Sequence, residues 1–246
     1  MGSPFRHFVQ LHKSAERLAA EIAGFTSAGL AAGEAVIIVA RPHHAKLLLQ
    51  ALADLGVDSE RYQAAGQLKL VDAEATLATI MGPSGFDRER CHAAFGAVID
   101  EVRGAGYEHI RLYGEMVDML WQRGYFAAAI LLEEYANDVG RLHDLAIFCS
   151  YLLDGFLESS YAGPIGEIGR THTDIVPTSE DEYLREAIDA ATRKFLGTPV
   201  SKIVSLSESP PGEDRLPLGR RAILWLKRFM PLKVGEILEL ARRQAA

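Results

Sequence analysis

Residues 40–47 join a predicted strand to a predicted helix, where a nucleotide-binding loop would lie, so their types bear on phosphate chemistry. Such a loop has the pattern G-x-x-x-x-G-K-[ST], in which amides and lysine bind phosphate and the hydroxyl holds magnesium. Here both glycines are replaced by alanine, Leu47 replaces the hydroxyl residue, and Pro42 lacks an amide donor. We therefore do not expect productive Mg-ATP binding. The remaining polar residues form either an anion site at the helix N-terminus or an exposed polar loop: Arg41, His43, His44 and Lys46.

Two glutamates stand where a carboxylate could meet a ligand. Glu115 follows the predicted strand 109–113, after Gly114, at the carboxyl end of that strand. Its carboxylate either hydrogen-bonds a ligand or caps the next helix, and both alternatives stay open because glutamate in a first helical turn is already favourable. Glu133 lies on the predicted helix 125–139, where ligand binding competes with a structural role such as pairing with arginine.

Cysteine and histidine give no recognisable catalytic or metal-binding pattern. Cys149 ends the predicted strand 145–149, and the spacing identifies no base that would activate it, so a small buried apolar role is expected. The 8 histidines include no H-x-x-x-H spacing, and no cysteine pair accompanies them. Neither G-x-S-x-G nor a G-x-G-x-x-G between strand and helix occurs. The sequence predicts no metal, no cofactor and no catalytic residue, and hence a protein that is not an enzyme.

Strand-like and helix-like segments alternate through the first two-thirds of the chain. The run Ala-Val-Ile-Ile-Val-Ala at 35–40 is typical of a strand buried on both faces of a parallel sheet. Helices of this length between strands imply right-handed crossovers. We therefore predict a three-layer α/β fold, with a mostly parallel sheet and helices on both faces. Ligands of such sheets bind outside the carboxyl ends of the strands. The predicted strands are 4–11, 35–40, 67–71, 109–113, 145–149 and 173–176.

Composition narrows the class of protein. The chain has 246 residues, 48% of them hydrophobic and 24% charged, which is typical of a globular protein rather than a disordered one. A net charge of −7 argues against a general nucleic-acid-binding surface. Only 2 cysteines are present, which fits a reducing compartment, and no apolar run approaches a membrane span. We expect a cytoplasmic protein that binds neither nucleic acid nor membrane.

The chain changes character after Pro177, and we place a domain boundary between residues 178 and 179. Residues 179–196 are predicted to be a helix with a capping box at Ser179–Glu182, and 198–217 a linker rich in proline and serine. Residues 218–246 are predicted to form two short basic amphipathic helices around Pro231. On a helical wheel Arg220, Arg221, Lys227 and Arg228 share a basic arc opposite an apolar one. The apolar face of that helix packs on its own domain or on another copy, docks on a partner helix or, as the least favoured alternative, meets an anionic membrane surface. The candidate partner-binding residues are Arg221, Trp225, Arg228 and Phe229.

Several segments in order resemble the MEDS domain, a sensory domain of methanogen, methylotroph and DcmR-type proteins. The resemblance covers about His7 to Pro177. Its segments are His7, GLAAGE at 29–34, GQL at 66–68, RLYGEMVDMLW at 111–121, LEE at 132–134 with Asn137, CSY at 149–151 and HTDIVP at 172–177.

The resemblance implies a RecA/KaiC-like core with a degenerate phosphate loop, residues 1–178 being the sensory domain. Such domains act as signal-input modules beside histidine kinases or transcriptional regulators, and small organic ligands are proposed for them. Positions matching the family's polar residues would line or support the crevice. With Arg41 and His43 from the loop, the expected ligand-binding set is His7, Arg41, His43, Glu115, Glu133, Cys149, Tyr151 and His172.

The leading functional hypothesis is a non-enzymatic signalling protein. It would bind a small ligand or a protein in the crevice and relay its state through the C-terminal helices to a kinase, an anti-sigma system or a transcriptional regulator. The alternative is an ATPase-like enzyme with a non-standard phosphate loop, supported by Lys46 and Glu115. A third hypothesis is a structural module that forms homo-oligomers.

Overall fold

The chain divides into two compact units in a computed structural model that describes residues 5–82 and 85–244. One unit comprises Met1–Val9 with Ser14–Tyr151, and the other Gln10–Lys13 with Leu152–Ala246. The boundary expected after residue 178 thus falls inside the second unit.

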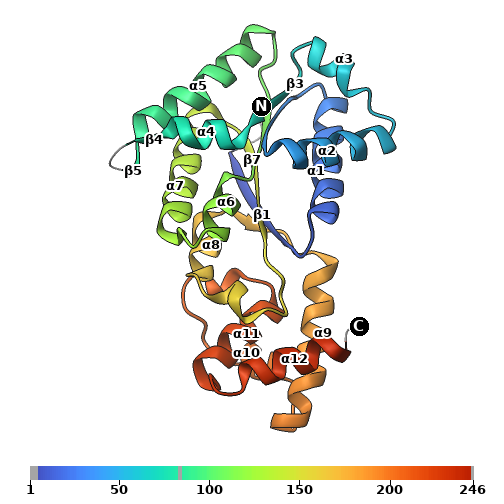
Figure 1. Cartoon of the computed structure of the whole chain (residues 1–246), viewed down its shortest axis with the longest axis vertical. Helices are drawn as coiled ribbons and strands as arrows, with labels where there is room; N and C mark the ends of the chain where they lie inside the picture. The colour runs from blue at the N-terminus through green and yellow to red at the C-terminus, as the bar shows by residue number, and fades with distance from the viewer. Residues whose placement is uncertain (1–4, 83–84, 245–246) are drawn as a thin grey trace. The chain divides into compact units, whose positions relative to one another are not determined.

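The first unit is built on a sheet of largely parallel strands (Figure 1). β2 (Ala35–Ala40) pairs in parallel with both β3 (Leu68–Asp72) and β6 (Ile110–Gly114), and β6 pairs in parallel with β7 (Ala146–Leu152). Every residue of β2 is buried, as its uninterrupted apolar sequence predicts. In spatial order the strands are β3 (Leu68–Asp72), β2 (Ala35–Ala40), β6 (Ile110–Gly114), β7 (Ala146–Leu152) and β1 (Arg6–His12).

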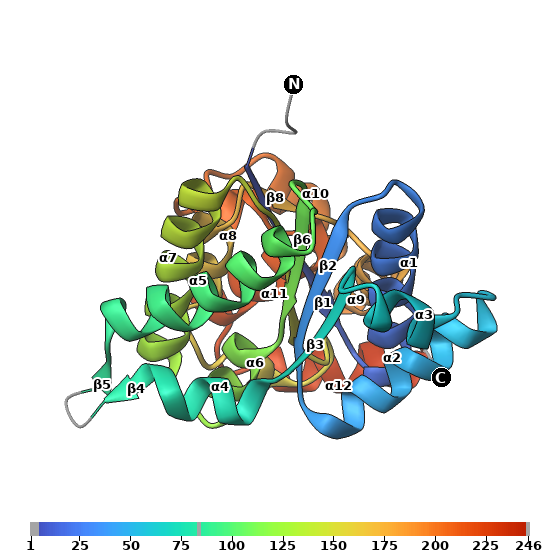
Figure 2. The same ribbon diagram turned by 90° about the horizontal axis from the view of Figure 1, so that it is seen from above.

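Helices cover both faces of this sheet, which confirms the predicted three-layer α/β class (Figure 2). One face carries α1 (Ala15–Ala31), α2 (Pro42–Asp54) and α3 (Ser59–Ala64). The other carries α4 (Ala73–Ile80), α5 (Arg88–Gly104) and α7 (Phe126–His143), with α6 (Met116–Gln122) packed on α7. Between α4 and α5, β4 (Met81–Gly82) and β5 (Gly85–Phe86) pair as antiparallel strands.

Local sequence explains where these helices begin and how closely one of them packs. Ser14 and Asp87 each accept a hydrogen bond from a first-turn amide, of α1 and α5 respectively. On α7, a methyl group at Gly140 would lie 2.2 Å from Phe5 and 2.9 Å from Ile147 of β7. The close approach of α7 to β7 therefore requires glycine at position 140.

The second unit is mainly helical and centres on α9 (Ser179–Leu196), which packs against α10, α11 and α12. Its N-cap is Thr178 with Asp181, one residue before the predicted capping box, because the Asp181 carboxylate accepts the Thr178 amide at 2.9 Å. The segment predicted to be a linker contains α10. The remaining elements are η1 (Glu158–Tyr161), α8 (Ile165–Thr171), β8 (Asp174–Ile175), α10 (Val200–Ser205), η2 (Glu213–Arg215), α11 (Leu218–Phe229) and α12 (Val234–Gln244).

Arg220 corrects the simple helical-wheel reading of α11. It was expected on an exposed basic arc, yet it is 2% exposed, and its Nε donates to Asp181 at 2.8 Å. Its other nitrogens donate to the carbonyls of Leu153 and Leu11, both at 3.4 Å. Next to Arg220, Gly219 allows α11 to approach the backbone of α9, since a methyl group there would lie 2.9 Å from Arg185 N. The buried ion pair thus ties α11 to α9 within this unit.

None of the helices in the described residues is long and apolar enough to cross a lipid bilayer.

Candidate functional site

A buried group of polar side chains in the first unit is here named the His7 cluster: His7, Glu133, Asn137, Cys149 and Tyr151. His7 comes from β1, and Cys149 and Tyr151 come from β7, two residues apart and therefore on one face of that strand. Glu133 and Asn137 lie four residues apart on α7 and so share one face of the helix. The topology brings these side chains together because β1 and β7 are neighbours and α7 packs over β7.

Short contacts connect the members of the His7 cluster. His7 Nδ1 donates to Asn137 Oδ1 at 3.1 Å, which leaves Nε2 facing Cys149 Sγ at 3.1 Å and Glu133 Oε2 at 3.3 Å. Cys149 Sγ lies 3.4 Å from Glu133 Oε2, and the Tyr151 hydroxyl donates to Glu133 Oε1 at 2.6 Å. His7 and Glu133 are both 0% exposed, so water does not screen these contacts.

Burial and charge favour protonated forms of two groups in this cluster. Burial raises the pKa of the Cys149 thiol well above its ordinary value, and the nearby Glu133 carboxylate raises this pKa further. The pKa of Tyr151 is raised for the same two reasons. A thiol whose pKa is raised in this way is a poor nucleophile, because the thiolate is the reactive form.

A second group, here named the Glu115 cluster, lies at the carboxyl ends of β2 and β6 and contains Arg41, His44, Glu115 and Asp118. From β2 the chain continues to β3, which pairs with one edge of β2. It then returns to β6, which pairs with the opposite edge of β2, so the strand order reverses between β2 and β6. Such a switch point is the usual ligand position in an open α/β sheet. Glu115 therefore lies at the edge of the sheet where the sequence predicts a ligand crevice.

Glu115 is 1% exposed, and its carboxylate is bound by the loop that follows β2. It accepts hydrogen bonds from the Arg41 amide and from His44, and Arg41 Nε donates to it at 2.9 Å. Arg41 also lies 3.6 Å from Asp118. Of the two roles left open by the sequence, capping of α6 is not observed, because the Glu115 side chain makes no capping hydrogen bond there. Hydrogen bonding of this carboxylate to a ligand stays a prediction.

The loop's charges stabilise ionised Glu115. Burial alone would raise the pKa of this carboxyl, but the hydrogen bonds from His44 and the Arg41 amide, with the charges of both residues, outweigh it and lower the pKa below its ordinary value. His43 is exposed, and its ring contacts that of His44 in a tilted arrangement, with ring centroids 4.1 Å apart. Slight burial and the neighbouring His44 and Arg41 charges lower the pKa of His43.

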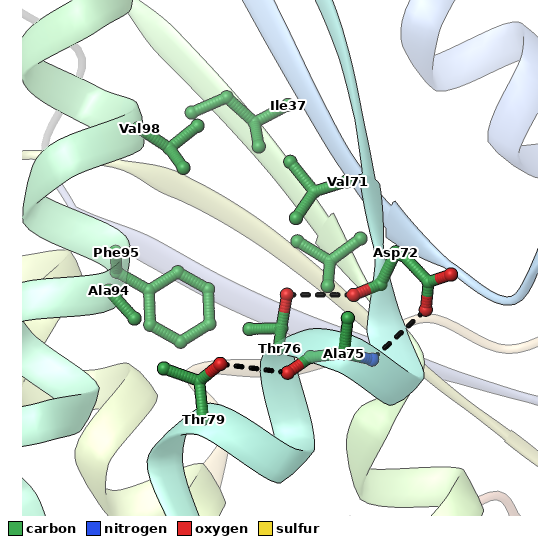
Figure 3. A pocket seen from close by; sticks show the side chains of 10 residues that line it. Ile37, Val71, Asp72, Ala75, Thr76, Thr79, Ala94, Phe95 and Val98 are labelled. Atoms are coloured by element: carbon green, nitrogen blue, oxygen red, sulfur yellow. Dashed lines mark hydrogen bonds between the residues drawn. The ribbon is translucent and has the colours of Figure 1, made fainter.

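A pocket of about 190 Å³ opens beside the carboxyl halves of β2 and β3, under α4 and α5 (Figure 3). Apolar side chains dominate its walls, among them Ile37, Val39 and Phe95. Two hydroxyls in the wall donate to backbone carbonyls of their own helix, Thr76 to Asp72 at 2.8 Å and Thr79 to Ala75 at 2.9 Å. The pocket therefore presents mainly apolar surface to a ligand.

The contacts of the expected ligand-binding residues thus fall into two clusters rather than one. His7, Glu133, Cys149 and Tyr151 meet in one, and Arg41 and Glu115 in the other, while His43 points to solvent. His172 belongs to the second unit, where it is 3% exposed and its Nδ1 donates to the Ile168 carbonyl at 2.7 Å.

The expected ligand-binding set left out His44, Asp118 and Asn137. The sequence analysis named His44 only within a possible anion site and Asn137 only within the family resemblance. Asp118 could have been found from its position three residues after Glu115. The apolar pocket carries no sequence signature, since its walls come from strands and helices whose apolar residues read as ordinary core.

The expected partner-binding residues all lie on α11, and most have partners within their own unit. Arg228 donates to Glu213 at 2.9 and 3.0 Å, and Arg221 donates to Ser209 at 3.2 Å. The rings of Trp225 and Phe229 contact each other in a tilted arrangement with centroids 4.9 Å apart, and Phe229 is 60% exposed. Phe229 is therefore the member of this set best placed to meet another molecule.

Comparison with known families and structures identifies the class of this protein. The MEDS family, described as MEthanogen/methylotroph, DcmR Sensory domain, matches residues 6–173. The chain belongs to this family of sensory domains.

No curated protein is similar to the chain. Among solved structures, a KaiC-like protein from the hyperthermophilic archaeon Pyrococcus horikoshii OT3 is similar at 12% sequence identity, with a TM-score of 0.39. That match covers 61% of this chain and 62% of the archaeal one, less than two thirds of its length.

Proposed function

We propose that this chain is a non-enzymatic, cytoplasmic signal-transduction protein that senses a small organic molecule through its first unit. Its C-terminal helices pass the resulting state to a partner such as a histidine kinase, an anti-sigma protein or a transcriptional regulator. The family's sensory description supports the general role. The two cysteines are buried free thiols, which suits a reducing compartment such as the cytoplasm.

The observation that carries the proposal is the occupation of the β2–α2 turn by Glu115. In a phosphate-binding loop the amides and basic side chains at this position bind the nucleotide anion. Here a buried carboxylate of the same chain binds the Arg41 amide, the Arg41 guanidinium and His44. A phosphate taking that place would leave Glu115 buried without its cations, and breaking a buried ion pair costs about 3–5 kcal/mol.

The neighbouring pocket suits a small apolar molecule. At about 190 Å³ it is larger than the ~150 Å³ that accommodates benzene but smaller than the ~300 Å³ at which drug-sized pockets begin. Val39, the penultimate residue of β2, lines this pocket. A ligand in the pocket would therefore lie close to the β2–α2 turn that Glu115 binds. Binding shifts a signalling equilibrium only if the ligand prefers one of two states, and this proximity gives the ligand a means to favour one.

Thermal unfolding of the full chain tests this proposal. A panel of small organic molecules, Mg-ATP and Mg-ADP would each be added to the wild type. A ligand at 100 times its dissociation constant should stabilise the folded state by about 2.7 kcal/mol. We expect such a shift with an apolar organic molecule, its loss in Ala94→Phe, which fills the pocket, and its retention in Ala97→Phe on the exposed side of the same helix.

The competing proposal is an ATPase-like enzyme with a non-standard loop. A stabilising shift with Mg-ATP that Lys46→Ala removes would favour that enzyme and contradict the sensory proposal. If an organic molecule stabilised Ala94→Phe and Ala97→Phe equally, that molecule would not bind in this pocket.

The relay through α11 has its own test. Proteins that co-purify with the full chain from its source cells would be compared for the wild type and for Arg228→Glu combined with Phe229→Ser. The exposed Lys202→Glu on α10 is the matched control. We expect a signalling protein to co-purify with the wild type and with Lys202→Glu, but not with the Arg228→Glu and Phe229→Ser double variant. Equal recovery with all three chains would contradict a relay through this helix.

A further inference from the structure

The His7 cluster presents the donor types that a transition-metal ion prefers. Its three inward-facing ligand atoms are an imidazole nitrogen of His7, a carboxylate oxygen of Glu133 and the sulfur of Cys149. Nitrogen, sulfur and carboxylate oxygen are the protein ligands of zinc. The three residues come from β1, α7 and β7, so they converge through the fold and not through a local motif.

The distances between these atoms fit a single tetrahedral ion. Zinc bonds of about 2.0–2.2 Å to nitrogen and oxygen, and about 2.3 Å to sulfur, place tetrahedral ligands about 3.3–3.6 Å apart. The observed separations are 3.1 Å between nitrogen and sulfur, 3.3 Å between nitrogen and oxygen, and 3.4 Å between sulfur and oxygen. Each lies within about half an ångström of the value that those bond lengths require.

Charge also balances in this buried setting. His7 and Glu133 are 0% exposed and Cys149 is 3% exposed, so a dication there needs two anionic ligands to avoid an uncompensated buried charge. The Glu133 carboxylate and the Cys149 thiolate supply two negative charges, and neutral His7 adds none. The thiol proton is released to solvent when the ion binds.

Residues behind the ligands hold them in the required orientation. The Asn137 carbonyl oxygen accepts the Nδ1 proton of His7, which directs the Nε2 lone pair toward Cys149 and Glu133. The Tyr151 hydroxyl donates to Glu133 Oε1, while Glu133 Oε2 faces His7 Nε2 and Cys149 Sγ. Such supporting hydrogen bonds are characteristic of metal sites, and their loss typically weakens metal binding 10–100-fold.

We propose that His7, Glu133 and Cys149 bind one zinc ion inside the first unit. This inference does not rest on the proposed sensory function, because its donor set shares no residue with the Glu115 cluster or with the lining of the apolar pocket. A tetrahedral zinc ion takes a fourth ligand in addition to these three.

Metal analysis and cobalt substitution test the site in the full chain. Zinc per chain would be measured by mass spectrometry after expression with added zinc and extensive dialysis, and we expect one equivalent. Cobalt(II), which takes similar sites, would then be titrated into reduced, metal-free protein. We expect visible bands of tetrahedral cobalt together with a near-ultraviolet thiolate-to-cobalt charge-transfer band.

Variants assign the ligands. Cys149→Ser should abolish the charge-transfer band, whereas Cys91→Ser, the other buried cysteine, should keep it. Asn137→Ala should retain the band with affinity lowered 10–100-fold. Circular dichroism would verify that each variant is folded.

The wild type alone can overturn the proposal, even if Cys149→Ser fails to fold. Folded wild-type chain without zinc and without the charge-transfer band would mean that the three residues form only a hydrogen-bonded group. An unchanged band in folded Cys149→Ser would equally exclude this site.

Discussion

Arg220 offers a quantitative test of what stabilises the second unit. Arg220→Met keeps most of the side-chain volume but removes the cation, leaving Asp181 charged at 4% exposure and the Leu11 and Leu153 carbonyls without this donor. Removing one partner of a buried ion pair costs about 3–5 kcal/mol. Because Asp181 still accepts hydrogen bonds from the Thr178 amide and hydroxyl, we expect a loss near the lower end, about 3 kcal/mol.

Urea unfolding followed by Trp225 fluorescence measures this loss. The chain has 2 tryptophans, so a Trp121→Phe background leaves Trp225 on α11 as the reporter. Adding Asp181→Asn to Arg220→Met removes the unpaired charge and should recover about 1–2 kcal/mol of the loss.

Arg228→Met is the matched control, because Arg228 lies on the same helix, is 40% exposed and pairs with Glu213. An exposed pair of this kind contributes about 0.2–1 kcal/mol. If Arg220→Met and Arg228→Met lowered the free energy of unfolding equally, or if the added Asp181→Asn recovered nothing, the assignment of Arg220 as a buried stabilising cation would be wrong.

Two further predictions concern the first unit. Glu115→Gln should lower the free energy of unfolding by about 1.5–3 kcal/mol at neutral pH, since hydrogen bonds to charged groups contribute that much. The folded-state pKa of Glu115 lies below its ordinary value of 4.5. The difference in free energy of unfolding between wild type and Glu115→Gln should therefore be complete above pH 4.5 and disappear as the pH falls through the lower folded-state pKa. A difference that does not change with pH would contradict this. Gly140→Ala should destabilise by about 1–3 kcal/mol through overpacking on Phe5, whereas Gly96→Ala, with open space at its position in α5, should stabilise by about 0.4–1 kcal/mol. Denaturant unfolding checks both substitutions, and equal effects would refute the packing argument.

Much of the fold follows from local sequence. The buried strand 35–40 is observed as predicted, because six consecutive apolar residues leave no polar face. Ser14 was expected to be an N-cap and accepts the Arg17 amide. The short helices α3 and α6 were not predicted, since neither is long enough for an apolar periodicity to show.

Long-range pairings were beyond local sequence. Helical periodicity placed Arg220 with exposed basic residues, and only the three-dimensional structure reveals the Asp181 carboxylate that compensates its burial. The grouping of His7 with Cys149 depends on which strands are neighbours in the sheet. The spacing of the histidines gave no metal pattern because the proposed ligands lie on three separate elements.

The position of β1 in the sheet has a consequence for synthesis on the ribosome. β1 is made before the other strands of this sheet, but its neighbour β7 follows much later, with His7 and Cys149 separated by 142 residues. At a translation rate of about 5–20 residues per second, the ribosome takes roughly 7–30 s to make that interval. During that time β2, β3 and β6 can already associate, while the N-terminal strand has no partner edge. The nascent chain is therefore most exposed to wrong strand pairing before β7 leaves the exit tunnel.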